Sequence, residues 1–209
     1  MPLRDARAAI LVRALKHGGM RVEALIDEPD PCAAIREVIS FNEGQPPESR
    51  IDGIHYDYEP WTKTEAWVAP LLAIYARAHA LAASGQLPFA VDFSAVKLAH
   101  LSQSEQHAIA DAVSRIVLMA YEAPAAVVHK RAAAFLAERK TTSAEWMVAV
   151  RVKDFAATAL SPAERCPAGN ILSALDAAYG GKPGYAGWAL YDYNTTLDAR
   201  YCPVECCLR

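Results

Sequence analysis

Three ionisable side chains alternate along one short segment of the sequence, Ile51–Trp61. Because isoleucine and tyrosine favour strands and Pro60 stops further pairing, this segment is predicted to form a β-strand. Successive side chains point to opposite faces of a strand, so His55, Asp57 and Glu59 are predicted to share one face. Such groups are costly to bury unless each is hydrated, paired or hydrogen-bonded. The pattern favours a site for proton transfer, and a purely structural cluster of histidine and carboxylates is the alternative.

The two carboxylates of this segment, Asp57 and Glu59, have Cα atoms about 6–7 Å apart if the segment is extended. Two neighbouring carboxylates push their pKa values apart, so that one keeps a proton near neutral pH and can act as a general acid. We assign this catalytic role to Glu59, with Asp57 as its catalytic partner. His55 is predicted to support them, either by hydrogen-bonding Asp57 or by holding it ionised as an imidazolium. A satisfied core histidine is the alternative.

The segment belongs to a repeating pattern of short β-rich runs, polar breaks and Ala-rich stretches. The predicted strands begin 28 to 40 residues apart, which matches the roughly 30-residue βαβ unit of a parallel sheet. The six predicted strands are Arg21–Glu28, Ile51–Glu59, Leu87–Ser94, Arg115–Glu122, Trp146–Asp154 and Ala186–Tyr193. The segments between the strands are predicted to be helical, and the clearest helix candidates in the sequence are Leu3–His17, Trp67–Ala83, Ser104–Ser114, Ala125–Lys140 and Asn170–Tyr179.

Strands that alternate with helices indicate a parallel α/β fold. Polar residues stand at the carboxyl ends of nearly all six strands, where a (β/α) barrel collects its site, and no Gly-rich phosphate loop follows a strand. A TIM-type barrel is therefore favoured over a doubly wound sheet. A full barrel has eight strands, so six strands predict an incomplete barrel. We expect a single partial barrel domain over residues 1–209, a Cys-containing tail at 195–209, and homo-oligomers that cover the open strand edges.

The composition narrows the classes of function. The 209 residues carry a net charge of −3 and are 53% hydrophobic, which indicates a folded domain without a basic surface for nucleic acid. No apolar stretch approaches the roughly 20 residues that span a bilayer, so no membrane partner is expected. The sequence as given has no signal peptide and predicts a cytoplasmic protein, or a secreted or periplasmic one if residues precede Met1. Five scattered cysteines predict free thiols, and we expect no metal and no other cofactor.

The motif Asp52-Gly53-Ile54-His55-Tyr56-Asp57-Tyr58-Glu59 resembles the Asp-Gly-x-Asp-x-Asp-x-Glu pattern on the fourth barrel strand of the family 18, chitinase-like glycoside hydrolases. The resemblance implies that Glu59 is the general acid. It also implies that Asp57 orients and stabilises a substrate acetamido group. His55 departs from the pattern, because the family has an aspartate at that position.

Two further segments resemble the same family. Met119-Ala120-Tyr121-Glu122 is similar to its Met-x-Tyr-Asp motif on strand six. This implies that Tyr121 hydrogen-bonds the substrate, while Glu122 stands where an aspartate is usual. Gly187-Trp188 resembles the eighth-strand tryptophan beneath the sugar. In this register, the first two barrel strands are the missing ones.

Further candidates come from other strand ends and from tryptophans. Asp92 is predicted to support the carboxylates, and Arg151 to hold a substrate charge. Trp61 and Trp188 are predicted sugar-stacking platforms, and Asp192 is a predicted substrate-binding residue at the end of the last strand. For each of these residues, a hydrated or paired position at the rim of the sheet is the alternative.

Three functions follow from this pattern. The first is a glycoside hydrolase-like protein that cleaves a β-linked saccharide, N-acetylated if the 2-acetamido group is the nucleophile. The second is a catalytically inactive saccharide-binding or scaffold relative, which the missing strands and His55 favour. The third is a metal-dependent hydrolase that uses His55, Asp57 and Glu59 as ligands.

Overall fold

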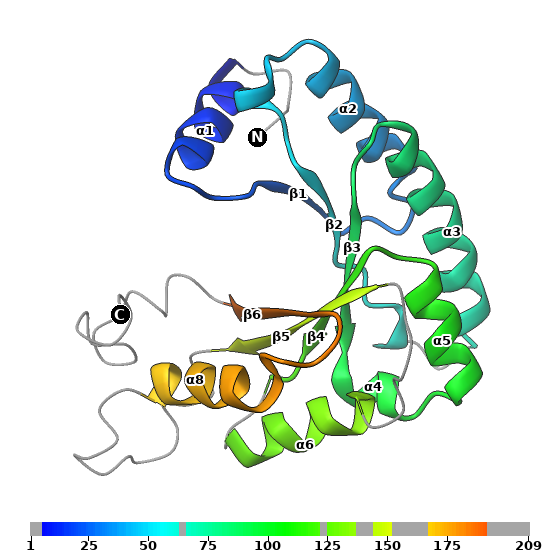
Figure 1. Ribbon diagram of the computed structural model, residues 1–209. Helices are drawn as coiled ribbons and strands as arrows, with labels where there is room; N and C mark the ends of the chain where they lie inside the picture. The colour runs from blue at the N-terminus through cyan, green and yellow to red at the C-terminus, as the bar shows by residue number, and fades with distance from the viewer. Residues whose placement is uncertain (1–5, 63–65, 122–124, 137–143, 152–166, 192–209) are drawn as a thin grey trace. The chain divides into compact units, whose positions relative to one another are not determined.

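The computed structural model describes residues 6–62, 66–121, 125–136, 144–151 and 167–191, in which helices and strands alternate (Figure 1). The strands are β1 (Glu23–Ile26), β2 (Gly53–Tyr56), β3 (Phe89–Ser94), β4 (Arg115–Met119), β5 (Glu145–Arg151) and β6 (Tyr185–Tyr191). The helices are α1 (Ala6–His17), α2 (Cys32–Glu43), α3 (Val68–Ser84), α4 (Ala95–Ala99), α5 (Gln103–Asp111), α6 (Ala125–Leu136) and α8 (Pro167–Tyr179). Two 3₁₀ turns, η1 (Pro47–Ser49) and η2 (Pro60–Thr62), flank β2.

The six strands form one open sheet in the order β1-β2-β3-β4-β5-β6, so each strand is hydrogen-bonded to the next in the sequence. Parallel strands joined by helices in sequential order are the arrangement of an α/β barrel, and six strands leave it incomplete. The predicted fold class is thereby confirmed. Among the residues that the structure describes, none of the helices has the length and apolar character needed to cross a bilayer.

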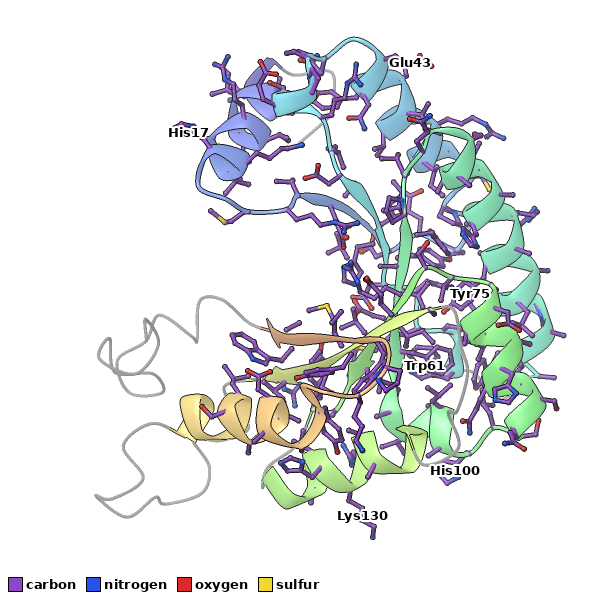
Figure 2. The ribbon with its side chains drawn as sticks, viewed as in Figure 1. His17, Glu43, Trp61, Tyr75, His100 and Lys130 are labelled. Carbon is purple, nitrogen blue, oxygen red and sulfur yellow. The ribbon has the colours of Figure 1, made fainter. Side chains whose placement is uncertain are left out.

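The chain divides into two compact units, Met1–Asp92 with His107–Arg115, and Phe93–Gln106 with Ile116–Arg209. In the first unit, one face of β2 packs against α3. Ile54 and Tyr56 alternate with His55 along the strand and are fully buried. The rings of Tyr56, Tyr75 and Phe89 lie about 6 Å apart, and Tyr75 points from α3 toward the sheet (Figure 2). This apolar packing fixes which face of β2 is left for polar side chains.

A partly buried ion pair connects helix α1 to the residue that precedes β2. Nζ of Lys16 lies 2.6 Å from Oδ1 of Asp52 and also donates to the carbonyl oxygens of Pro47 and Arg50. The second carboxylate oxygen of Asp52 accepts a hydrogen bond from the backbone N–H of Val22. These contacts anchor the amino-terminal ends of β1 and β2.

The second unit has its own apolar core. Val148 and Val150 of β5, Val128 of α6 and Leu175 of α8 are fully buried. An aromatic cluster joins β5, β6 and α8, with ring centroids of Trp146, Tyr179 and Tyr185 4.7–6.0 Å apart. Trp146 of β5 thus packs against both α8 and β6.

Candidate active site

Strand β2 places its polar side chains on one face of the first unit. It pairs in parallel with β1 and β3, and His55 lies opposite Leu25 and Ala90. The backbone N–H of Asp57 donates to the carbonyl oxygen of Ile26 at 2.8 Å, which carries the strand geometry one residue beyond β2. His55 and Asp57 therefore lie on the same face, opposite the apolar side chains that meet α3. We call this the polar face.

Both ring nitrogens of His55 face carboxylates on the neighbouring strands. Nε2 lies 3.0 Å from Oδ2 of Asp92 on β3, and Nδ1 lies 3.5 Å from Oε2 of Glu23 on β1. The 3.0 Å contact between Nε2 and Asp92 is an ion pair when His55 is protonated. The expected hydrogen bond between His55 and Asp57 is therefore not what holds the ring. The parallel register brings the carboxylates of β1 and β3 to it instead.

Glu23 is the centre of this group of charges. Its Oε1 lies 3.1 Å from Nη1 of Arg115 at the start of β4 and 3.1 Å from Nε of Arg21. A Cβ atom at Gly53 would lie 3.3 Å from Oε1 of Glu23, so the glycine leaves room for this carboxylate beside β2. Arg115, Glu23, His55 and Asp92 thus form a chain of alternating charges, which we call the ion-pair chain.

The ion-pair chain favours the charged forms of its members. Burial opposes a positive charge on His55, but the carboxylates of Asp92 and Glu23 outweigh burial and raise the pKa of His55 to about 9. Burial likewise opposes ionisation of Glu23. The contact with His55 and the charges of Arg115 and Arg21 outweigh it, so the pKa of Glu23 lies below its usual value. At neutral pH, His55 is therefore an imidazolium.

Asp57 lies next to the ion-pair chain, but its surroundings favour the uncharged form of its side chain. Burial of its carboxyl group, together with repulsion from Asp92 and Glu59, raises its pKa to about 6, against the attraction of His55. Its Oδ1 atom is buried and has no hydrogen-bond partner among the described residues. The raised pKa thus falls on Asp57, whereas the sequence pattern assigns the retained proton of the pair to Glu59.

Glu59 is exposed and follows Asp57 on the segment that leads into η2. Its Oε2 accepts a hydrogen bond from the indole Nε1 of Trp61 at 3.1 Å. Trp61 is only 6% exposed and packs edge-to-face against Trp67 (ring centroids 5.8 Å apart), so its ring orients Glu59 and does not offer a free face to a sugar (Figure 2). This corrects the predicted role of Trp61 as a stacking platform.

An open pocket of about 490 Å³ lies next to this segment. Tyr58 and Pro60, the neighbours of Glu59 in the sequence, line it together with Trp67 and residues of α3. Neither Asp57 nor Glu59 is among the residues that line this pocket. The pocket therefore lies on the side of β2 that faces α3, opposite the polar face that carries Asp57.

The second unit contains two other predicted site residues. The guanidinium of Arg151 lies over the ring of Tyr121, 5.4 Å from its centroid, and Arg131 donates to the carbonyl oxygen of Tyr121 at 3.0 Å. The structure thus brings Tyr121 and Arg151 together at the carboxyl ends of β4 and β5. Glu122, Asp192 and the tail at 195–209 lie outside the described residues.

Trp188 does not have the orientation expected of a platform beneath a sugar. Its indole Nε1 donates to Oδ2 of Asp176 on α8 at 3.1 Å, and the hydroxyl of Tyr185 donates to Oδ1 of the same residue. Gly187, with a φ of 108°, interrupts the alternation of β6 and brings Trp188 to the side of Tyr185. The side chain of Trp188 therefore turns toward α8, an orientation that does not match the predicted platform beneath a sugar.

Glu23 and Arg115 contribute to the polar face, although the sequence alone did not single them out. They are 92 residues apart, and each stands at the first position of its strand. Each is a charged residue at the start of a strand, on the same face of the sheet as His55. Recognising this requires the register between the strands, which cannot be read from the sequence.

Comparisons with known proteins support the fold and leave the chemistry open. No protein-family model and no curated protein matches this sequence. The C-terminal domain of a chitinase-like protein from Desulfitobacterium hafniense DCB-2 is similar in structure, with 14% identity, a TM-score of 0.49 and coverage of 71% of this chain and 51% of that one.

Two further similar structures come from Rhizomucor miehei. One is a glycoside hydrolase family 17 β-1,3-glucanosyltransferase, with 13% identity, a TM-score of 0.50 and coverage of 68% of this chain and 54% of that one. The other is an active-site mutant of the β-1,3-glucanosyltransferase in complex with laminaritriose, with 13% identity, a TM-score of 0.49 and coverage of 69% and 55%.

This chain spans about half the length of each of these proteins. At such identities the likeness concerns the fold. The sequential parallel sheet and the likeness to the family 17 enzyme agree on an incomplete α/β barrel, and they do not single out family 18.

Proposed function

We propose that this chain is a glycoside hydrolase-like protein that acts on a β-linked saccharide, with Glu59 as the general acid and Asp57 as its partner. The observation that supports this most directly is Asp57, a half-buried carboxyl group with a pKa of about 6 and a buried oxygen without a hydrogen-bond partner in the described part of the chain. A buried carboxyl oxygen without a hydrogen bond lowers the stability of the folded protein. Its presence is therefore better explained by an interaction with a ligand than by packing.

The two carboxyl groups suit a substrate-assisted reaction. Glu59 gives its proton to the glycosidic oxygen as the bond from that oxygen to the anomeric carbon breaks, and the carbonyl oxygen of a 2-acetamido group on the same sugar bonds to the anomeric carbon. Asp57 accepts a hydrogen bond from the acetamido N–H and stabilises its developing positive charge. Water then opens the resulting ring, and Glu59 takes back a proton.

The test is hydrolysis of oligosaccharides of β-linked N-acetylglucosamine, with laminaritriose as a substrate that lacks the acetamido group. Glu59→Gln is expected to lower kcat by at least about 100-fold while leaving saccharide binding in calorimetry unchanged, because the amide keeps the shape but has no acidic proton. Glu37→Gln, which changes an exposed carboxylate on α2, is the matched control and is expected to keep full activity. Equal activity of wild type and Glu59→Gln would contradict the assignment.

A non-catalytic saccharide-binding protein is the second candidate. It is favoured by His55, whose imidazolium is held by Glu23 and Asp92 at the position where the resembling family has an aspartate. On this account, wild type and Glu59→Gln bind the same oligosaccharide with equal affinity, and neither hydrolyses it. The metal-dependent hydrolase is less well supported, because the described residues contain no group of three or more histidine, cysteine or carboxylate side chains placed to hold a metal ion.

A further inference from the structure

The pocket of about 490 Å³ beside α3 takes no part in the proposed reaction. It is built within the first unit, from the segment that follows β2 and from the first two turns of α3. No lining side chain is of a charged type, and four of them contain a ring. Besides one alanine, the lining consists of Tyr58, Pro60, Trp67, Pro70, Leu71 and Ile74.

We propose that this pocket binds a small molecule with an uncharged planar ring, about the size of a phenyl or indole group. Pockets for small molecules measure roughly 300–1,000 Å³ and are mostly apolar, with a few polar groups. A single aromatic ring fits an apolar cavity of about 150 Å³, so the pocket has room for one ring and its substituents. Because the pocket lies on the side of β2 opposite Asp57, this proposal is independent of the proposed hydrolysis.

The core of the first unit holds the walls of the pocket in place. Leu71 is 1% exposed, and Pro60 is buried. The ring of Tyr58 lies 6.1 Å from that of Tyr56, which in turn packs edge-to-face against Tyr75. Walls that are already ordered lose little conformational freedom on binding, which favours a rigid ligand such as a ring.

The residue types in the lining determine which ligands fit. A charged ligand would lose part of its hydration without gaining an opposite charge, which costs free energy. The flat faces of Tyr58 and Trp67 suit offset or edge-to-face contacts with an aromatic ring. The hydroxyl group of Tyr58 is the donor or acceptor for one polar substituent. The lining therefore favours a neutral aromatic molecule over an ion.

Trp67 connects the pocket with the candidate active site. Its ring lies 5.8 Å from that of Trp61, whose Nε1 donates to Oε2 of Glu59. An aromatic ring bound against Trp67 changes the magnetic environment of the indole N–H groups of both tryptophans. The other two tryptophans of the chain, Trp146 and Trp188, belong to the second unit. The four indole N–H signals therefore report where a ligand binds.

The experiment follows these four signals by NMR in the ¹⁵N-labelled chain while benzyl alcohol is added. Benzoate is the matched probe, because it has a similar size but carries a charge. Benzyl alcohol is expected to shift the signals of Trp67 and Trp61 saturably, with a Kd of about 1 mM, and to leave those of Trp146 and Trp188 in place. Benzoate is expected to bind at least about 10-fold more weakly, because no lining residue balances its charge.

A variant that fills the pocket provides a second test. Ile74→Phe adds a ring at the wall formed by α3 and is expected to weaken the binding of benzyl alcohol at least about 10-fold. Ile10→Phe makes the same exchange at a 58% exposed position of α1 and is expected to leave the affinity unchanged. If Ile74→Phe does not fold, the comparison of benzyl alcohol with benzoate on the wild type decides alone.

The absence of a saturable shift at about ten times the expected Kd overturns the proposal. Equal shifts of all four indole signals, or binding of benzoate as tight as that of benzyl alcohol, overturn it as well. Unchanged affinity in a folded Ile74→Phe has the same consequence. Because none of these measurements uses a saccharide, they remain decisive whether or not Glu59 and Asp57 catalyse hydrolysis.

Discussion

Two regions of the polar face differ in whether each charged side chain has an oppositely charged neighbour. The ion-pair chain runs from Arg115 and Glu23, at the starts of β4 and β1, through His55 on β2 to Asp92 on β3, and each of its charges has an opposite charge next to it. At the carboxyl end of β2, Asp57 is repelled by Asp92 and Glu59 and has one buried oxygen without a hydrogen bond among the described residues. The first region is arranged for stability, and the second holds a charge that stability alone does not explain.

This difference separates a structural cluster from a candidate active site within one strand. His55 and Asp57 are two residues apart and share a face, so a sequence pattern treats them alike. The neighbouring strands distinguish them, because β1 and β3 supply His55 with two carboxylates while they add a repelling carboxylate to Asp57. The same spacing thus produces a cation held by two carboxylates at His55 and a carboxyl group with a raised pKa at Asp57.

The largest expected effect on stability comes from breaking the ion-pair chain. His55→Gln leaves Asp92 without its cation, and losing one partner of a buried pair is expected to cost about 3 kcal/mol of unfolding free energy. Urea unfolding at pH 7 measures it. Lys16→Met, which breaks a more exposed ion pair, is the control and is expected to cost less than about 1 kcal/mol. A loss of unfolding free energy in His55→Gln no greater than that of the control would show that the ion-pair chain does not stabilise the fold.

The wild-type protein is expected to lose stability in alkaline solution. The pKa of His55 is about 9 in the folded state, above its unfolded value near 6.5, so the folded state binds the proton more tightly. Its contribution is fully present below about pH 6.5 and is lost as the pH rises through about 9. The expected loss between pH 7 and pH 10 is about 2 kcal/mol.

This alkaline loss can be assigned to His55 by comparison with the variant. Urea unfolding of the wild type and of His55→Gln is measured at the same series of pH values. The wild type is expected to approach the stability of the variant as the pH rises from 7 to 10. A constant difference between the two proteins over this range would show that His55 is not the group that titrates.

Trp61→Phe probes the segment after β2 that carries Asp57 and Glu59. The phenyl ring keeps much of the packing against Trp67 but cannot donate the hydrogen bond to Glu59. We expect a stability loss of about 1 kcal/mol and a larger fall in kcat than in saccharide affinity, because Glu59 loses its orientation. Unchanged kcat at unchanged stability would show that the indole N–H has no part in placing Glu59.

Leu25→Ser gives the smallest expected effect. Leu25 is 67% exposed on the edge strand β1 and lies opposite His55 in register, so its loss is expected to change stability by less than about 0.5 kcal/mol. The same variant tests the expected homo-oligomer. If a second copy covers this edge, Leu25→Ser lowers the oligomer fraction in sedimentation. Unchanged sedimentation would show that no oligomer depends on this side chain.

The sequence predicted the fold well where periodicity was strong. All six predicted strands overlap observed ones, since each is a short apolar run bounded by polar breaks. Helix α2 lies in a segment that was predicted to be helical without stated bounds, because Cys32–Glu43 mixes β-branched, polar and aromatic residues with no strong intrinsic preference for a helix. Burial of Ile35 and Val38, one turn apart, is what holds this segment helical.

The candidate site was predicted in part for a related reason. Alternation along β2 sufficed to place His55 and Asp57 on one face, because it is a local property. The partners of His55 depend on the register of β1, β3 and β4, and Glu23 and Arg115 could not be paired with it from spacing alone. Trp188 was misplaced because the bulge at Gly187 shifts the alternation by one residue.

One measurement tests the central claim most directly: the unfolding free energy of Asp57→Asn minus that of the wild type, from pH 3 to pH 8. The pKa of Asp57 is about 6 when folded and near 3.8 when unfolded, so the wild type loses stability as the pH rises between these values and stays lower above them. The account predicts that the variant becomes the more stable protein above pH 6. The expected gain is about 1 kcal/mol once solvent screening of this half-buried group is allowed for. A variant that is less stable than the wild type at pH 7 would show that Asp57 is a structural carboxylate, and would contradict the account.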